Sequence, residues 1–117
     1  TLAEAAAQAW GPRVRVLDWV AAGNAVEEGA LVVNATSLGM EGRPALRVPL
    51  DGLRPGQVVV DLVYAPLETR LLAEARAAGA TAVDGLGMLL HQAAPAFEAW
   101  WGVRPEVDEA LRAAVLA

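Results

Sequence analysis

The sequence has 117 residues, of which 56% are hydrophobic and 20% charged, a composition that suits one globular domain and excludes a disordered chain. Its net charge of −5 disfavours a nucleic-acid surface, which needs clustered cations. The absence of cysteine excludes disulfides, and with a single histidine it disfavours a transition-metal site. All nine basic residues are arginine, so no side chain of the sequence can act as an amine in catalysis.

The first third of the sequence predicts a helix, two strands and a short acidic connection. Residues 1–10 are rich in alanine and indicate a helix that Thr1 caps and Gly11-Pro12 ends. Residues 14–19 alternate in polarity and predict a short strand, and residues 21–28 predict about one helical turn. Residues 30–34 (ALVVN) are apolar until their last position, which predicts a strand covered on both faces.

The remainder predicts a loop followed by alternating strands and helices. Residues 37–49 hold two glycines and two prolines and predict a loop, and Arg54-Pro55-Gly56 predicts a turn. Strands are expected over 58–63 and 80–83. Helices are expected over 67–78 with Pro66 in the first turn, over 86–101 before the breaker Gly102, and over 107–116. No apolar run reaches the roughly 18 residues needed to cross a membrane.

Buried strands that alternate with helices predict an α/β fold with a parallel sheet flanked by helices. Such sheets bind ligands beyond the carboxyl ends of their strands. Polar residues or glycine follow three predicted strands in turn, namely Asn34 and Thr36, then Asp61 and Tyr64, then Asp84 and Gly85. The sequence therefore predicts a ligand site at this edge of the sheet.

Two of these strand ends each allow a functional and a structural interpretation. In NATSLGM (residues 34–40) the amide and hydroxyls either line a nucleotide or form a turn that satisfies its own backbone. In DLVY (residues 61–64) the phenol of Tyr64 is able to donate to a carboxylate. The alternative is a tyrosine that caps the sheet edge, with Asp61 bonded to neighbouring backbone amides.

The third strand end, DGLGMLLHQ (residues 84–92), is the most informative. Gly85 and Gly87 permit a close approach of backbone to a ligand at the start of a helix. Gly85, Met88 and Gln92 are spaced three and four apart and so share one helix face. A helix start with a methionine that fills the core is the alternative. His91 points away from that face, which favours a surface histidine over a base.

Taken together, NATSLGM, DLVYAP and DGLGMLLHQAAPAFEAWWG resemble the C-terminal half of the shikimate dehydrogenase family, over roughly residues 31–105. The resemblance implies a partial Rossmann-like sheet and NADP-dependent reduction of 3-dehydroshikimate to shikimate. It also implies that Tyr64 binds the shikimate carboxylate and Gln92 the ring hydroxyls. The cofactor-binding residues that it implies are Asn34, Thr36, Leu62, Gly85 and Met88.

The departures from the family pattern are also informative. The family places a catalytic lysine and aspartate in an N-terminal substrate domain, and it binds the pyrophosphate with a glycine-rich turn; the present sequence has neither a lysine nor such a turn. We therefore expect a fragment, inactive alone, in which residues 1–85 belong to the NADP-binding domain. Residues 86–117 are expected to form helices that pack toward the missing domain or mediate a homodimer. A cytoplasmic location is expected.

Other functions fit parts of this pattern. A non-catalytic nucleotide-binding or assembly module would explain the missing lysine and glycine-rich turn. A quinate or dual quinate/shikimate enzyme that uses NAD is a close variant, because the residues that discriminate between the cofactors lie upstream. A methylene-folate dehydrogenase is disfavoured by DGLGMLLHQ.

Overall fold

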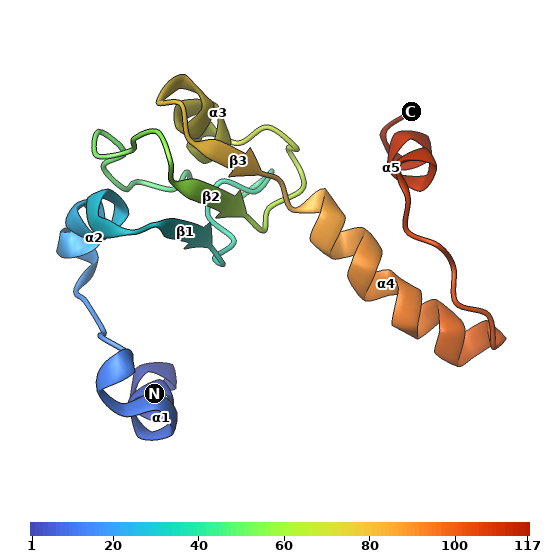
Figure 1. Cartoon of the computed structure of the whole chain (residues 1–117), viewed down its shortest axis with the longest axis horizontal. Coiled ribbons are helices and arrows are strands. Elements are labelled where there is room, and N and C mark those ends of the chain that lie inside the picture. The colour runs from blue at the N-terminus through green and yellow to red at the C-terminus, as the bar shows by residue number, and fades with distance from the viewer.

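Three parallel strands form the centre of the structure, a computed structural model that describes residues 1–117 (Figure 1). They are β1 (Leu31–Asn34), β2 (Val58–Asp61) and β3 (Thr81–Val83), and they lie side by side in chain order. The register pairs Asn34 with Asp61, so two of the predicted polar strand ends are neighbours. The predicted parallel sheet is confirmed, although β2 ends two residues earlier than expected.

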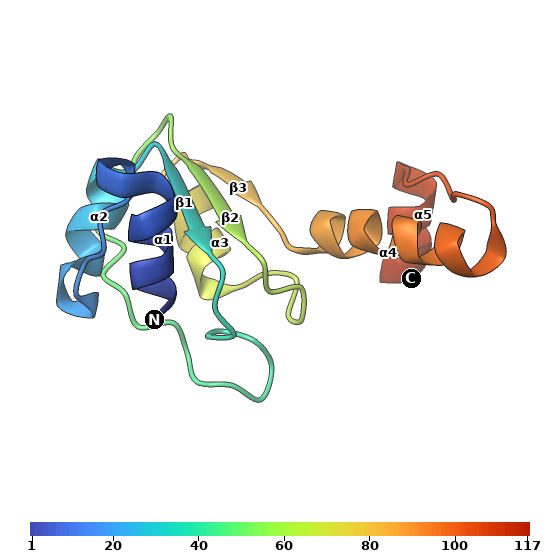
Figure 2. The ribbon, with the colours of Figure 1, turned by 90° about the horizontal axis from the view of Figure 1, so that it is seen from below.

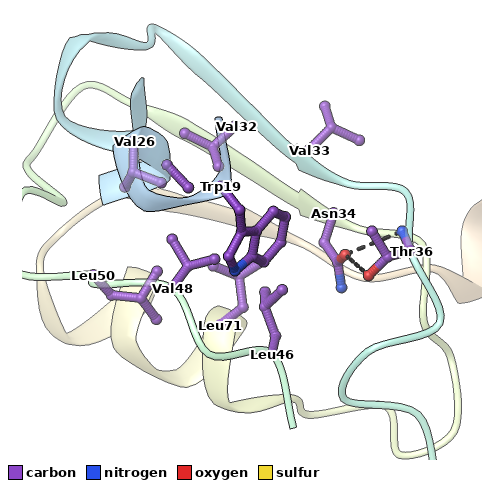
Figure 3. A pocket seen from close by; sticks show the side chains of 11 residues that line it. Trp19, Val26, Val32, Val33, Asn34, Thr36, Leu46, Val48, Leu50 and Leu71 are labelled. Atoms are coloured by element: carbon purple, nitrogen blue, oxygen red, sulfur yellow. Dashed lines mark hydrogen bonds between the residues drawn. The ribbon is translucent and has the colours of Figure 1, made fainter. Parts of the chain in front are cut away.

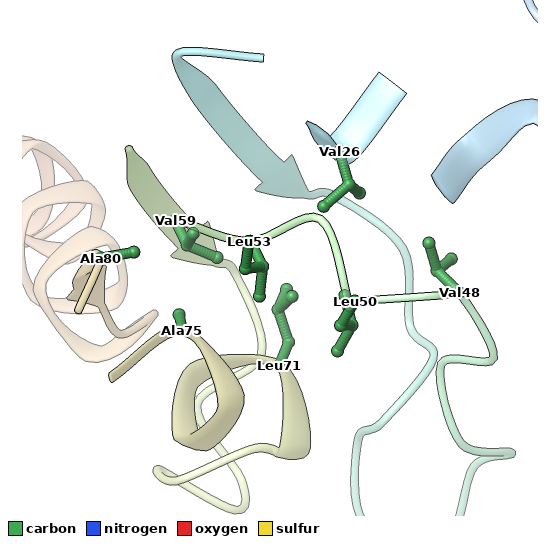
Figure 4. Packing of buried hydrophobic residues seen from close by; sticks show 8 residues of the cluster. All are labelled: Val26, Val48, Leu50, Leu53, Val59, Leu71, Ala75 and Ala80. Carbon is green, nitrogen blue, oxygen red and sulfur yellow. The ribbon is translucent and has the colours of Figure 1, made fainter. Parts of the chain in front are cut away.

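One face of the sheet carries the hydrophobic core. Helices α2 (Ala22–Glu28) and α3 (Arg70–Ala77) cover it together with the segment between β1 and β2 (Figure 4). Val59 and Ala75 are completely buried there. Full burial of a valine or leucine side chain stabilises the fold by about 1.5–3 kcal/mol. The cluster comprises Val26, Val48, Leu50, Leu53, Val59, Leu71, Ala75 and Ala80.

The opposite face of the sheet is open. The side chains of Leu31, Val33 and Val83 are 59%, 48% and 42% exposed. The prediction that residues 30–34 are covered on both faces is therefore wrong for this structure. An apolar strand indicates that a face can be buried, but the cover must come from another element, and none of the described residues provides it.

The N-terminal residues lie apart from the sheet (Figure 1). Helix α1 (Leu2–Trp10) has the predicted cap: the Glu4 amide donates to the Thr1 hydroxyl, and the Thr1 amine donates to the Glu4 carboxylate. Short 3₁₀ turns follow at Gly11–Arg13 and Trp19–Ala21. The strand predicted at residues 14–19 is wrong, because alternating polarity makes a strand only where a neighbouring strand offers its edge.

Helix α3 begins later than predicted. Its N-cap is Thr69, whose hydroxyl accepts the Leu72 amide at 3.4 Å, so Pro66 lies in the preceding loop and not in the first helical turn. Gly79 ends the helix as expected, with a positive φ of 78°. The predicted turn before β2 is also present, because the Gln57 amide donates to the Arg54 carbonyl at 3.4 Å.

Two helices project from the sheet as an arm (Figures 1 and 2). Helix α4 (Leu86–Trp101) has the predicted bounds, continues through Pro95 and ends at Gly102 with a φ of 72°. Helix α5 (Glu109–Leu116) begins two residues later than expected, because Asp108 is its N-cap and accepts the Leu111 amide at 2.8 Å. No helix in the structure is both long and apolar enough to span a membrane.

Candidate functional site

A cavity of about 440 Å³ lies at the carboxyl ends of β1 and β2. We call it the strand-end cavity. Its walls are the loop that follows β1 and the loop that follows β2, as expected for a parallel sheet. The residues that line it are Ala35, Thr36, Met40, Glu41, Leu62, Val63, Tyr64 and Ala65. Three of the predicted site residues, Thr36, Leu62 and Tyr64, therefore meet in one cavity.

A buried carboxylate joins the two walls beneath this cavity. One oxygen of Asp61, Oδ1, accepts the Asn34 side-chain amide at 2.9 Å and the Val63 backbone amide at 3.0 Å. The other, Oδ2, accepts the Thr69 hydroxyl at 2.7 Å. Asp61 is 1% exposed, and Asn34 and Thr69 are each 5% exposed. The carboxylate thus ties three segments of chain together at a buried position.

The NAT turn satisfies its own backbone and also forms a cavity wall. The Asn34 side-chain oxygen accepts both the Thr36 amide at 3.1 Å and the Thr36 hydroxyl at 2.7 Å (Figure 3). The Thr36 hydroxyl in turn accepts the Leu38 amide at 3.1 Å. The structural interpretation of this motif is therefore confirmed for Asn34. Thr36 lies in the same turn, yet it is exposed and lines the cavity.

Tyr64 stands at the cavity wall with 47% of its surface exposed. Its neighbour across the gap is the loop after β1, whose Glu41 amide donates to the Ala65 carbonyl at 2.8 Å. The sequence reasoning missed Met40 and Glu41, although Met40 lies within the NATSLGM motif. Glu41 is the one charged side chain that lines this cavity, so the hydrogen-bond donors there are hydroxyls and backbone amides.

Gly85 brings the third strand end against the second. A Cβ atom built on Gly85 would lie 2.4 Å from the carbonyl oxygen of Leu62 and 2.8 Å from that of Val63. Backbone atoms cannot give way as a flexible side chain can, so only glycine fits at this contact. Since Leu62 and Val63 line the strand-end cavity, the start of α4 packs directly behind its wall.

The other two predicted residues of α4 lie further along the arm. Met88 is 37% exposed and lines no cavity in the structure. Gln92 is exposed and lines a second, mostly apolar cavity of about 540 Å³ between α4 and α5. In this conformation Gln92 and Tyr64 do not share a cavity. His91 is exposed, as the sequence predicted.

An ion pair that the sequence did not indicate fastens α5 to the start of α4. Arg112 donates to both carboxylate oxygens of Asp84, at 3.2 and 2.5 Å, and the Leu86 amide donates to the same carboxylate at 3.0 Å. Burial alone would raise the pKa of Asp84, but the hydrogen bonds from Arg112 and Leu86 outweigh it and lower the pKa. The partners are 28 residues apart, so no local spacing indicates them.

A smaller cavity of about 160 Å³ lies on the covered face of the sheet, next to the core (Figure 3). Trp19, 54% exposed, lies over apolar side chains that include Val26, Val48 and Leu71. Asn34 and Thr36 border it at one end. Its volume is close to that of a single benzene-sized apolar cavity, so it does not accommodate a dinucleotide.

The sequence and the fold match known proteins. Residues 85–115 match the family model described as "Shikimate 5'-dehydrogenase C-terminal domain". The chain is 67% identical over 115 residues to the shikimate dehydrogenase (NADP(+)) of Cereibacter sphaeroides, which covers 98% of the chain and 41% of the relative. It is 60% identical over 116 residues to the enzyme of that name from Rhodospirillum rubrum, again over 98% of the chain and 41% of the relative. Nearly the whole chain is therefore similar to part of the shikimate dehydrogenases.

Solved structures of related enzymes share the fold. Shikimate 5-dehydrogenase from Thermus thermophilus, solved with NADP(H) and shikimate, aligns with a TM-score of 0.68 and 39% identity over 88% of the chain and 37% of that structure. Quinate dehydrogenase from Corynebacterium glutamicum, solved with NAD, aligns with a TM-score of 0.76 and 36% identity over 90% of the chain and 38% of that structure. The sheet is therefore the Rossmann-like sheet of shikimate dehydrogenases, and the chain spans about two fifths of the length of the curated relatives it matches.

Proposed function

We propose that this chain forms the nicotinamide-side part of an NADP-dependent shikimate dehydrogenase, which reduces 3-dehydroshikimate to shikimate in aromatic amino acid biosynthesis. The observation that carries the proposal is the strand-end cavity, in which Thr36, Leu62 and Tyr64 meet from the motifs that resemble this family. NADP supplies the hydride, and the protein binds and orients the reacting groups. A cytoplasmic enzyme fits this role.

The chain's own residues have distinct tasks in this proposal. Thr36, Leu62, Gly85 and Met88 border the cofactor, and Gly85 does so through its backbone, because the contact with Leu62 leaves no room for a side chain. Tyr64 donates its hydroxyl to the substrate carboxylate, a charge-assisted hydrogen bond of the stronger kind. Gln92 reads the ring hydroxyls, which requires the arm to bring α4 closer to Tyr64 than it lies here.

The proposed reaction also needs a side chain that transfers a proton, and we assign that side chain to another segment of the protein. The 117 residues contain no lysine, and the only histidine is exposed on α4. We therefore propose that a lysine and an aspartate of an N-terminal substrate domain complete the site and that residues 1–117 alone do not turn over. In this scheme residues 1–85 belong to the NADP-binding domain and residues 86–117 pack toward the substrate domain.

The exposed aromatic side chains of the arm fit this division. Trp100 and Trp101 are 74% and 64% exposed, and Phe97, which stacks on Trp101 with 4.7 Å between the ring centroids, is 42% exposed. A cluster of this kind is typical of a contact surface. In the absence of the substrate domain we expect it to favour a homodimer, which sedimentation of the chain at increasing concentration would detect.

A second candidate is a quinate or dual quinate/shikimate dehydrogenase that uses NAD. The likeness to the quinate dehydrogenase solved with NAD favours it. Because the residues that discriminate between the cofactors lie upstream, the substrate provides the test. Turnover of quinate in preference to shikimate by the reconstituted enzyme would favour this candidate.

The experiment that tests the proposed function is shikimate oxidation followed by NADPH absorbance. The assay uses residues 1–117 alone and again with a separately produced N-terminal portion of a family relative, which carries both the substrate domain and the glycine-rich turn. We expect no turnover alone and turnover on mixing. Turnover by the chain alone would contradict the assignment of proton transfer to another segment. No turnover and no cofactor binding in either sample would favour a non-catalytic module.

A further inference from the structure

We infer that Asp61 is the positioning residue of the strand-end cavity: its one carboxylate sets the spacing between the wall that carries Thr36 and the wall that carries Tyr64. Nothing in the family resemblance assigned this residue a part in ligand binding. The inference on spacing stands on the geometry of the chain itself. Only its consequence for turnover rests on the proposed function.

The three hydrogen bonds of the carboxylate reach three different segments. The Asn34 amide belongs to the end of β1, the Val63 amide to the loop that leads to Tyr64, and the Thr69 hydroxyl to the cap of α3. Thr69 also accepts the Leu72 amide, so the contact continues into the helix. A shift of the carboxylate would therefore change the position of each wall of the cavity.

Asn34 connects the Asp61 carboxylate to the wall that carries Thr36. Its amide nitrogen donates to Asp61 at 2.9 Å and to the Leu38 carbonyl at 3.1 Å, and its oxygen holds the amide and hydroxyl of Thr36. Both amide hydrogens and both lone pairs are thus engaged, and the side chain is buried. The Asn34 side chain therefore holds Thr36 in place at the cavity wall.

The chemistry of the site explains why a carboxylate stands here. All three partners of Asp61 are donors, and an ionised carboxylate is an acceptor at both of its oxygens. Asparagine has the same shape, but its amide would face one of the donors and leave the Thr69 hydrogen without an acceptor. On its other side the carboxylate borders a cavity of about 230 Å³ that Arg43, Glu68 and Arg70 also line.

A second link between the walls lies at the cavity rim, where the Glu41 amide donates to the Ala65 carbonyl. Both partners of this link are in exposed or half-buried loops, whereas Asp61 is 1% exposed. The Leu62 amide also donates to the Asn34 carbonyl at 3.0 Å and joins the two strand ends through the backbone. Asp61 is therefore the buried side-chain link between the walls, and it connects both strand ends to the cap of α3.

The chain offers a matched control at the other end of β2. Gln57 is completely buried and also makes three hydrogen bonds: it donates to the Val26 and Gly29 carbonyls at 2.7 and 2.6 Å and accepts the Arg54 amide at 2.8 Å. Gln57 lines none of the cavities. Exchange of amide for carboxylate at Gln57 also breaks buried hydrogen bonds, but it does so away from the strand-end cavity.

The readout is the signal of Tyr64, the only tyrosine of the chain. A sample labelled with ¹⁵N,¹³C-tyrosine gives one backbone amide resonance and one set of ring resonances. We expect Asp61→Asn to shift or broaden these resonances and Gln57→Glu to leave them in place, at temperatures where thermal unfolding shows both variants folded. Unchanged Tyr64 resonances in Asp61→Asn, or equal changes in Gln57→Glu, would overturn the inference.

A second pair of variants covers the case in which Asp61→Asn does not fold. Thr69→Val removes one of the three donors, and Thr69→Ser keeps the hydroxyl. Thr69→Val should shift the Tyr64 resonances, and Thr69→Ser should restore them. Identical Tyr64 resonances in the two Thr69 variants would overturn the inference by itself.

The reconstituted enzyme provides the functional readout. Asp61→Asn should lower kcat/KM for shikimate by about 10- to 100-fold, because a displaced binding group loses orientation, while Gln57→Glu should not change it in the folded enzyme. If the wild-type mixture is inactive, the proposed function fails, but the Tyr64 resonances still test the positioning role. Equal kcat/KM for wild type and Asp61→Asn would contradict that role.

Discussion

The two ends of strand β2 are built alike but are open to solvent to very different degrees. Gln57 at the amino end and Asp61 at the carboxyl end are both buried, and each side chain makes three hydrogen bonds. The partners of Gln57 are backbone groups of helix α2, of the residue that follows it and of the turn before β2. The partners of Asp61 are the end of β1, the cap of α3 and the loop residue Val63, which lines a cavity of about 440 Å³.

The difference shows that the amino end of this sheet serves stability, whereas its carboxyl end also leaves room for a ligand. Buried polar groups must be satisfied at both ends, and no buried side-chain polar atom of the structure lacks a partner. At the amino end this satisfaction closes the structure. At the carboxyl end the same requirement holds two loops apart, and that leaves Thr36 and Tyr64 accessible to a ligand.

The largest effect is expected where the third strand end meets the second. Gly85→Val places side-chain atoms against the Leu62 and Val63 carbonyls, where even a Cβ would be 2.4 Å away. We expect a loss of more than about 3 kcal/mol in the free energy of unfolding, measured by urea denaturation. Gly87→Ala is the control, because nothing lies within 4 Å of a Cβ there. A gain of up to about 1 kcal/mol is expected for that helical position. Equal effects of the two variants would contradict the packing role of Gly85.

The amino end of β2 is expected to affect stability alone. Gln57→Leu leaves the Val26 and Gly29 carbonyls and the Arg54 amide without partners. Each unsatisfied group costs about 1–3 kcal/mol, so the chemical midpoint should fall clearly. Calorimetric titration of the folded variant with NADP should give the wild-type affinity. A weaker affinity for NADP would show that the amino end of β2 also affects the cofactor site.

Tyr64 is expected to behave in the opposite way. Because 47% of the residue is exposed, Tyr64→Phe should change the free energy of unfolding by less than about 0.5 kcal/mol. In the reconstituted enzyme the same variant should raise KM for shikimate about tenfold, which corresponds to one charge-assisted hydrogen bond. Tyr64→Phe with a wild-type KM would remove Tyr64 from the substrate site.

The smallest effect concerns the attachment of the arm. The folded-state pKa of Asp84 lies below its ordinary value of 3.8, so the stabilisation from the Arg112 pair is present above that pH and is lost as the pH falls through the lower, folded-state pKa. Acid should therefore loosen α5 from α4, with a change in the fluorescence of Trp100 and Trp101. Arg112→Gln should show the loosened signal already at neutral pH. An acid transition of the same size in this variant would exclude Asp84 as its origin.

The features that the sequence predicted best are those that depend on residues close together in the chain. Helix α4 has the predicted bounds because Gly102, at a φ of 72°, ends it locally. The predicted motifs also converge, since Asn34 and Asp61 end paired strands. The strand expected at residues 14–19 failed because a strand needs a partner that local sequence does not supply.

Long-range polar contacts account for most of what the sequence did not reveal. Gln57 contacts Val26 from 31 positions away, and Arg112 contacts Asp84 from 28. The sequence offered a bond from Asp61 to neighbouring backbone amides as one alternative, and the Val63 amide makes that bond. Its bonds to Asn34 and Thr69 follow only from the register of the sheet and from the late start of α3 at its Thr69 cap.

The most direct test of the central claim is to add NADP to the uniformly ¹⁵N-labelled chain and to follow every backbone amide. The account predicts that the amides of Thr36, Leu62, Tyr64 and Gly85 shift, while those of Gln57 and of Gly29 beside it stay in place. Shifts centred on the amino end of the sheet, or no shift at any NADP concentration, would contradict the assignment of the strand-end cavity as the nicotinamide site.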